Sequence, residues 1–135
     1  MSKKYVLMSI KPQYAQSIKS GKKTVELRRV APKVTAGDII IIYESMPVQQ
    51  ITAFCEVESL LSMKPSDLWE AVYLKACITK EEFNQYFQGK QYANGIELKS
   101  VFLLDAPKTM RELSWDLHPP QSYCYISPAQ FEALY

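Results

Sequence analysis

A basic segment with a single carboxylate, Gly21–Arg29, holds the residues of this chain best suited to bind a charged ligand. Its Thr24–Arg29 part alternates apolar with polar residues, as a half-buried strand does. Side chains two positions apart lie on the same face of a strand, so Glu26 and Arg28 should project together. The apolar residues between them should anchor the strand from behind. Lys23, at the strand entry, should lean over the same rim.

One carboxylate among several cations has two physical uses. It can accept hydrogen bonds from an amine or a base edge, as Asp and Glu do from cytosine N4. It can also hold a guanidinium at the angle needed for bidentate phosphate contact. An ordinary surface ion pair, which contributes roughly 0–1 kcal/mol, would give the same pattern. The residue types alone leave these three alternatives open.

The charges along the chain are strongly polarised, although the formal net charge is only +2. Residues 1–33 hold nine Lys or Arg and one acid, whereas the other 102 residues hold seven bases and thirteen acids. A basic surface concentrates anionic partners such as nucleic acid. We therefore expect one-sided binding, with Lys11, Lys22, Lys23, Arg28 and Arg29 meeting phosphate.

Several classes of protein are poor matches to the composition. His118 is the single histidine, and the three cysteines are widely spaced, so we expect no metal site and no disulfide framework. The four glycines are too far apart for a dinucleotide fingerprint or a Walker loop, so no cofactor is expected. No apolar run approaches the roughly 20 residues that span a bilayer, and the N-terminus lacks a cleavage site. These features favour a cytoplasmic protein without a membrane partner.

The hydrophobic patterns predict strands with helices inserted between them, without regular βαβ alternation. Strands are expected at Tyr5–Ile10, Thr24–Arg29, Ile39–Tyr43, Ile51–Glu58, Gly95–Leu104 and Tyr123–Ile126. Helices are expected from Pro12 to a stop at Gly21, behind Ser66, behind a capping box at Thr79–Glu82, and from Pro128, with one or two helical turns in Thr109–Trp115. A length of 135 residues suits one domain, and the pattern suits a small α+β barrel.

The segment Gly21–Arg28 matches the G-x-K-x-x-E-x-R signature, and on it the chain resembles the ASCH domain, a branch of the PUA-like superfamily. Further stretches look like the longer ASCH proteins. These are Ser9-Ile10-Lys11-Pro12, Tyr43-Glu44-Ser45-Met46-Pro47, Lys80-Glu81-Glu82-Phe83 with Tyr86-Phe87, Gly95-Ile96-Glu97-Leu98 and Pro119-Pro120-Gln121-Ser122-Tyr123. The resemblance covers nearly the whole chain.

This resemblance implies a PUA-like pseudo-barrel of about five to six mixed strands with helices around it, spanning residues 1–135 as a single domain. It also implies a cleft that binds RNA or a nucleotide-like ligand, in a protein with a possible partner in transcription or translation. By analogy, Lys23, Glu26 and Arg28 line that cleft, and Ser9 and Lys11 lie nearby.

An enzyme is the alternative that the resemblance raises. A smaller ASCH type hydrolyses N4-acylated cytidines with a Thr nucleophile, and ribonuclease action has been attributed to other ASCH proteins. Here Glu26 occupies the position of that Thr, although Thr24 supplies a hydroxyl two residues earlier. The alternative is thus a metal-independent hydrolase of modified nucleosides or RNA that uses Lys23, Glu26 and Thr24.

Two further groups of residues are candidates for ligand contact. Tyr14, Tyr43 and Tyr123 lie at the ends of expected elements, where their rings could stack on bases. The stiff Pro119-Pro120 pair could present Gln121 and Ser122 as a preset wall, or it could simply connect two elements.

Overall fold

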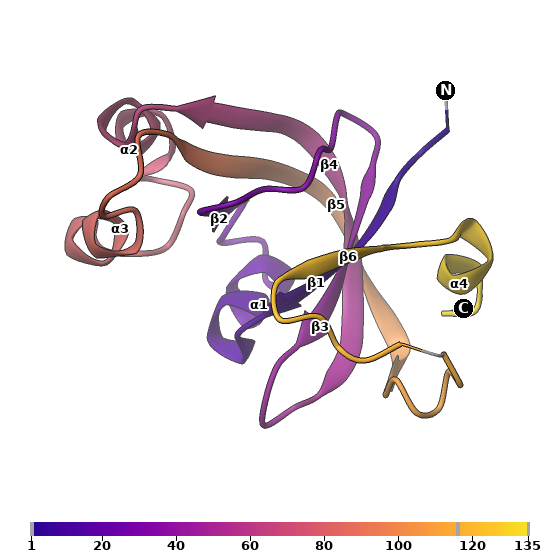
Figure 1. Ribbon diagram of the computed structural model, residues 1–135. Coiled ribbons are helices and arrows are strands. Elements are labelled where there is room, and N and C mark those ends of the chain that lie inside the picture. Colours follow the sequence, from indigo (N-terminus) through magenta and orange to yellow (C-terminus); the bar gives the residue numbers. More distant parts are fainter. Residues whose placement is uncertain (1, 116, 135) are drawn as a thin grey trace.

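The computed structural model describes residues 2–115 and 117–134, whose six strands form one curled, mixed sheet, an open half-barrel (Figure 1). The strands are β1 Tyr5–Ile10, β2 Val25–Arg28, β3 Ile39–Glu44, β4 Gln50–Met63, β5 Ala93–Lys108 and β6 Tyr123–Ile126. Their order across the sheet is β2-β5-β4-β3-β1-β6. Strands β1 and β3 run parallel, and the other neighbouring strands run antiparallel. This confirms the expected α+β pseudo-barrel of mixed strands.

Within the same residues, four helices surround the sheet: α1 Pro12–Lys19, α2 Pro65–Val72, α3 Lys80–Tyr86 and α4 Pro128–Glu132. A proline in the first turn opens α1, α2 and α4, and the Thr79–Glu82 capping box opens α3. Helix α1 ends before Gly21, whose φ of +84° is the left-handed conformation that glycine adopts readily. The helix stop therefore delivers the chain directly into the basic segment.

The central strand β3 is buried on both faces, as its run of isoleucines predicts. Ile40 and Ile42 pack in one cluster with Ile18 of α1. Ile39 and Ile41 pack in another cluster that includes Phe131 of α4. Helices α1 and α4 thus cover opposite faces of the sheet, as the two ribbon views show.

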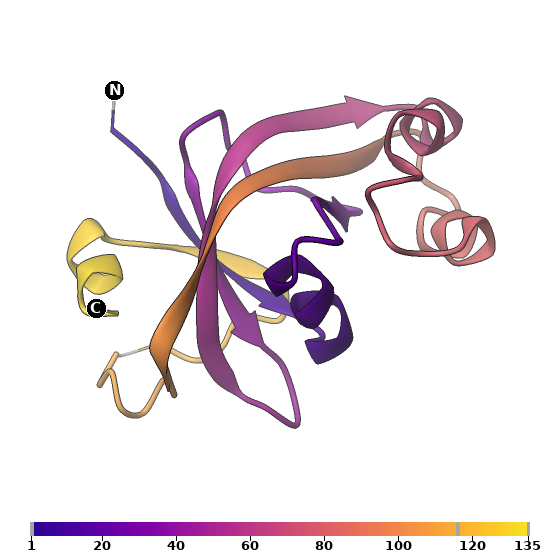
Figure 2. The ribbon, with the colours of Figure 1, turned by 180° about the vertical axis from the view of Figure 1, so that it is seen from behind.

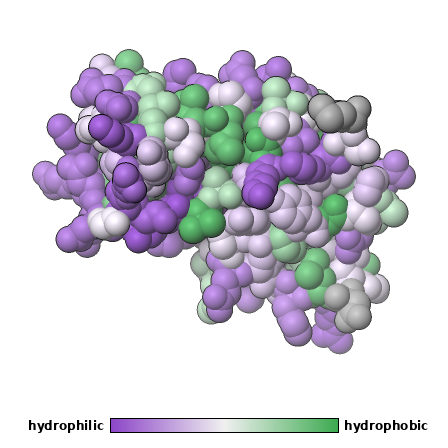
Figure 3. All heavy atoms as spheres, turned by 45° about the horizontal axis from the view of Figure 1, so that its top comes forward, coloured by the Kyte–Doolittle hydropathy of each residue, from purple (hydrophilic) through white to green (hydrophobic). Residues whose placement is uncertain are grey.

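Strands β4 and β5 extend beyond the rest of the sheet and carry a helical insertion, residues 64–92, at their far end (Figure 2). Their pairing continues to Met63 and Ala93. Helices α2 and α3 pack against β2 through a third hydrophobic cluster that contains Val25, Leu27 and Phe83. On the face seen in Figure 3, hydrophilic residues cover the end of the molecule that carries this insertion, and hydrophobic ones gather near the middle.

Two sequence predictions differ from the structure. Both β4 and β5 are longer than expected, because register shifts between Ile51 and Ser59 interrupt the alternation by which a strand is recognised. Thr109–Trp115 forms turns rather than the expected helical turns, although Thr109 and Glu112 exchange the hydrogen bonds of a capping box. The single i to i+4 hydrogen bond there, from Leu113 N–H to the Thr109 carbonyl, is long at 3.4 Å.

Candidate functional site

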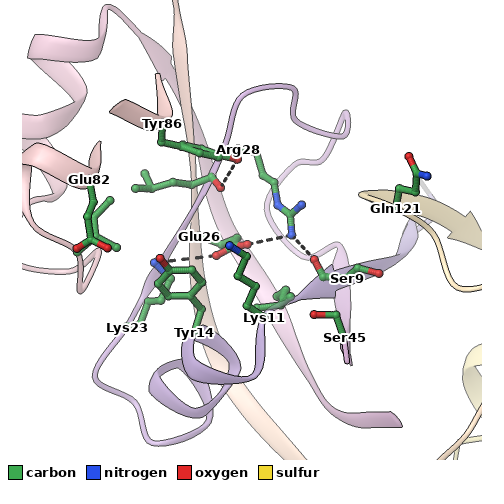
Figure 4. A pocket seen from close by; sticks show the side chains of 13 residues that line it. Ser9, Lys11, Tyr14, Lys23, Glu26, Arg28, Ser45, Glu82, Tyr86 and Gln121 are labelled. Atoms are coloured by element: carbon green, nitrogen blue, oxygen red, sulfur yellow. Dashed lines mark hydrogen bonds and ion pairs between the residues drawn. The ribbon is translucent and has the colours of Figure 1, made fainter. Parts of the chain in front are cut away.

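A pocket of about 360 Å³ lies where β1, α1 and β2 meet helix α3 (Figure 4). Its lining combines charged, hydroxyl and aromatic groups with a few apolar ones. The residues are Ser9, Ile10, Lys11, Tyr14, Lys23, Glu26, Leu27, Arg28, Ser45, Ile78, Glu82, Tyr86 and Gln121.

Strand β2 forms the floor of this pocket because its side chains alternate. Val25 and Leu27 pack against the helical insertion. Glu26 and Arg28 project together toward β1, as the strand pattern predicted. The alternation of β2 therefore both attaches the insertion and supplies the charged floor.

Glu26 lies between two cations on this floor. Its Oε2 is 3.0 Å from Arg28 Nη2, and its Oε1 is 4.0 Å from Lys23 Nζ. The side chain of Glu26 is only 9% exposed. This is a largely buried ion-pair triad rather than the exposed surface pair that the sequence left possible.

Arg28 also fastens neighbouring elements together. Its Nη2 donates to the Ser9 carbonyl at 2.7 Å, and its Nη1 donates to Ser122 Oγ at 3.3 Å. Ser9 N–H in turn donates to the Ser122 carbonyl at 2.9 Å. Among the described residues, nothing accepts a hydrogen bond from the buried Arg28 Nε. Arg28 thus joins β2 to β1 and to the loop that presents Gln121.

Lys23 is buried rather than leaning over the rim. Its ammonium group donates to the Ala76 carbonyl at 2.5 Å and lies 5.3 Å from the centre of the Tyr14 ring. Burial lowers the pKa of Lys23 from its ordinary value, and the Glu26 carboxylate partly offsets this effect. The pocket therefore holds a desolvated amine beside a carboxylate.

Helix α3 supplies the opposite wall. The Tyr86 hydroxyl donates to the Leu27 carbonyl at 3.3 Å and accepts from Arg29 N–H at 3.2 Å. Hydrogen bonds from the main chain and side chain of Thr79 lower the pKa of Glu82 at the helix start. Glu82 is thus held at the cap of its own helix, and Tyr86 is held by Leu27 of β2 and by Arg29.

The structure brings together, among the residues it describes, seven of the predicted site residues: Ser9, Lys11, Tyr14, Lys23, Glu26, Arg28 and Gln121. Their roles toward a ligand remain predictions. Ser122 is not part of the lining, but its hydroxyl accepts a hydrogen bond from Arg28. Tyr123 lies away from the pocket lining and donates to the Ala31 carbonyl.

Four other predicted residues lie elsewhere. Tyr43 is 4% exposed and packs with Ile41, because strand alternation places it on the α4 face while the pocket opens on the other. The guanidinium of Arg29 donates hydrogen bonds to the carbonyls of Tyr86 and Gln88. Lys22 is exposed outside the pocket. Thr24 precedes β2, and its N–H and carbonyl are bonded to Lys75 and Leu98.

Three polar residues of the lining were not predicted as site residues. Ser45 follows β3, and its N–H donates to the Ile10 carbonyl at 3.0 Å. Glu82 and Tyr86 are four residues apart on α3, beside the face that buries Phe83. That four-residue spacing was a usable signal, since it places both side chains on one helix face.

This chain is similar in sequence to proteins of one known family. The sequence profile of the ASCH domain matches residues 8–102. The chain belongs to the ASCH domain family. A relative from Zymomonas mobilis, named an ASCH domain-containing ribonuclease, is 28% identical over 140 residues, which cover 98% of this chain and 90% of the relative. The resemblance inferred from the Gly21–Arg28 signature is therefore confirmed.

Solved structures agree with this membership of the ASCH family. The crystal structure of ASCH from Zymomonas mobilis matches with a TM-score of 0.91 and 27% identity, over 98% of this chain and 94% of that one. The N-terminal domain of Staphylothermus marinus McrB matches with a TM-score of 0.66 and 11% identity, over 99% and 97% of the two chains. At that identity the second likeness concerns the fold alone.

Two further features are absent from residues 2–115 and 117–134 of this ASCH domain. No group of three or more His, Cys, Asp or Glu side chains there could hold a metal ion. None of its helices is both long and apolar enough to cross a bilayer.

Proposed function

We propose that this ASCH domain binds single-stranded RNA, or a nucleotide of it, with one base inside the pocket. The observation that carries the proposal is the Lys23–Glu26–Arg28 triad on the floor of a concave site walled by Tyr14 and Tyr86. The relative from Zymomonas mobilis that is named a ribonuclease supports an RNA ligand.

The size and walls of the pocket fit one unpaired nucleotide. Its volume of about 360 Å³ is at the small end of ligand sites, which leaves room for a single nucleoside but not for a base pair. Tyrosine rings are the usual stacking partners of unpaired bases in RNA complexes. We therefore expect tighter binding to single strands than to duplexes.

The charges suggest how the ligand is oriented. Lys11 is exposed at the pocket, and residues 1–33 carry the excess of basic residues. The cations on the floor are already engaged by Glu26 and by main-chain carbonyls. Phosphate should therefore lie outside, near Lys11, with the base directed inward.

The test is the binding of a short single-stranded RNA measured by fluorescence anisotropy over a range of salt concentrations. Affinity should fall steeply with salt, and Lys11→Ala should reduce the slope of log K against log salt by about 1. Lys3→Ala is the control, because Lys3 is exposed outside the pocket. Equal affinity at low and moderate salt would contradict the proposal.

Ribonuclease activity is the second candidate function, and one specific observation favours it. Lys23 has a lowered pKa, lies beside Glu26 in the pocket and is therefore suited to proton transfer. In such a reaction the RNA 2′-hydroxyl loses its proton and attacks the adjacent phosphorus. The bond to the 5′-oxygen breaks, that oxygen takes up a proton, and a 2′,3′-cyclic phosphate forms.

Cleavage is tested with a short RNA and its matched copy that carries one 2′-deoxynucleotide at the cleaved position. The deoxy copy should stay intact, because it lacks the attacking hydroxyl. Lys23→Met should lower the rate by roughly 100-fold or more, the usual contribution of a general acid or base. Turnover that survives this substitution would point to a contaminating nuclease.

A further inference from the structure

We propose that Glu26 makes the pocket selective for bases with an exocyclic amino group, with guanine preferred and uracil disfavoured. This inference rests on the proposed function, because it assumes that the pocket takes a base. It goes further by naming the residue that distinguishes one base from another.

The Glu26 carboxylate has acceptor positions that its two cations leave open. Its side chain is nine-tenths buried, and both cations approach it as ion pairs, at 3.0 and 4.0 Å. A carboxylate has about four acceptor positions, of which these two ion pairs occupy at most two. The acceptor positions that face the pocket are therefore available to a ligand.

Both neighbouring cations also donate to main-chain carbonyls in addition to pairing with Glu26. Arg28 Nη2 donates to the Ser9 carbonyl, and Lys23 Nζ donates to the Ala76 carbonyl. These bonds fix both cations beside Glu26 without saturating its oxygens. The carboxylate is therefore oriented by its neighbours and faces the pocket as an acceptor (Figure 4).

The donors that a ligand can offer decide which bases suit Glu26. A phosphate group presents only acceptors, which a carboxylate repels, and the ribose hydroxyls are the same in every ribonucleotide, so they do not distinguish one base from another. Uracil presents one ring N–H between two carbonyl oxygens, so two acceptors would face Glu26 beside a single donor. Adenine and cytosine each offer an amino group that donates to a Glu or Asp carboxylate, as cytosine N4 does. Guanine offers an amino group next to a ring N–H, which together match both carboxylate oxygens.

The experiment compares the binding of five ribonucleoside 5′-monophosphates by isothermal titration calorimetry: GMP, AMP, CMP, UMP and IMP. UMP should bind roughly tenfold or more weakly than GMP, as expected for one good bidentate contact. IMP differs from GMP only by the missing amino group and should also bind more weakly than GMP.

Glu26→Gln tests whether this residue is responsible. A carboxamide has nearly the same shape but presents one donor and one acceptor, so the ratio of GMP to UMP affinity should fall to about twofold or less. The ratio is the measured quantity, because removing a negative charge should strengthen phosphate binding for all five ligands. Glu56→Gln is the matched control, since Glu56 is ion-paired with Lys99 outside the pocket.

The possible failures are distinguishable. Equal affinity of the wild-type protein for all five nucleotides overturns the role of Glu26 and leaves the proposed function standing. No binding of any nucleotide or of short RNA overturns the proposed function itself. If Glu26→Gln does not fold, Glu26→Asp keeps the carboxylate and should keep the preference for GMP, and loss of that preference in a folded Asp variant contradicts the inference.

Discussion

Lys23 Nζ lies 2.5 Å from the main-chain carbonyl of Ala76, a hydrogen bond that joins the entry of β2 to the loop between α2 and α3. The bond spans 53 positions of sequence and is buried. A single side chain thus contacts the floor of the pocket through Glu26 and the helical insertion through Ala76. The burial that makes this contact possible also disfavours the charged form of the amine.

This burial predicts a pH dependence of stability. The pKa of Lys23 is lowered in the folded protein, mainly by burial, from an ordinary value of 10.5. Between the lowered pKa and 10.5, the unfolded chain holds the proton that the folded protein has lost, so stability should rise with pH across this window. Lys23→Met removes the titration. The free energy of unfolding, measured in urea from pH 7 to 10, should therefore rise for the wild-type protein relative to this variant. If the free energies of the two proteins change in parallel with pH, the lowered pKa of Lys23 is contradicted.

Replacing Cys77 by glycine should stabilise the protein. Cys77 has a φ of +54°, the left-handed region that costs a residue with a side chain roughly 1 kcal/mol. Cys77→Gly should therefore raise the free energy of unfolding relative to Cys77→Ala by about 1 kcal/mol, with both variants lacking the thiol. Chemical denaturation measures the difference. An alanine variant as stable as the glycine variant would show that the conformation carries no cost.

Arg29 should hold α3 in place rather than bind phosphate. Its guanidinium donates to the carbonyls of Tyr86 and Gln88 at 2.6 and 3.1 Å. Arg29→Ala should speed amide hydrogen exchange in α3 several-fold, because the end of the helix loses its anchor to the residue that follows β2. The salt slope of RNA binding should stay at the wild-type value, in contrast to Lys11→Ala. A slope reduced by about 1 would instead support the phosphate contact that the sequence predicted for Arg29.

The three cysteines should differ sharply in reactivity. Cys77 is exposed, Cys124 is partly buried, and Cys55 is buried. Burial raises the pKa of the Cys55 thiol to about 12, so almost no thiolate forms at pH 8. A thiol reagent followed by peptide mass spectrometry should label Cys77 first and Cys55 only after unfolding. Early labelling of Cys55 in the native protein would contradict its burial.

Local patterns were sufficient for much of the fold. The run of isoleucines in β3, the capping box at Thr79 and the glycine stop at Gly21 each depend on neighbours within a few residues, and each was predicted. The ends of β4 and β5 were not, because they depend on how the two strands pair across several register shifts. Pairing of this kind is a long-range property that no short window of sequence contains.

The residues of the candidate site likewise divide into those set by local pattern and those set by distant elements. Glu26 and Arg28 lie two apart on one strand, so their meeting could be predicted from alternation alone. The burial of Lys23 depends on Ala76 in the helical insertion, and the burial of Tyr43 depends on which face α4 covers. Both outcomes are set by elements far away in the sequence.

The pairing of Met63 with Ala93 brings the two ends of the helical insertion together at the tip of one hairpin. The segment between them can therefore change in length or sequence without altering the order of the sheet. Its residues Ile78, Glu82 and Tyr86 form one wall of the pocket, whereas the floor belongs to β2. A change confined to this segment would therefore reshape the wall of the pocket and leave its charged floor in place.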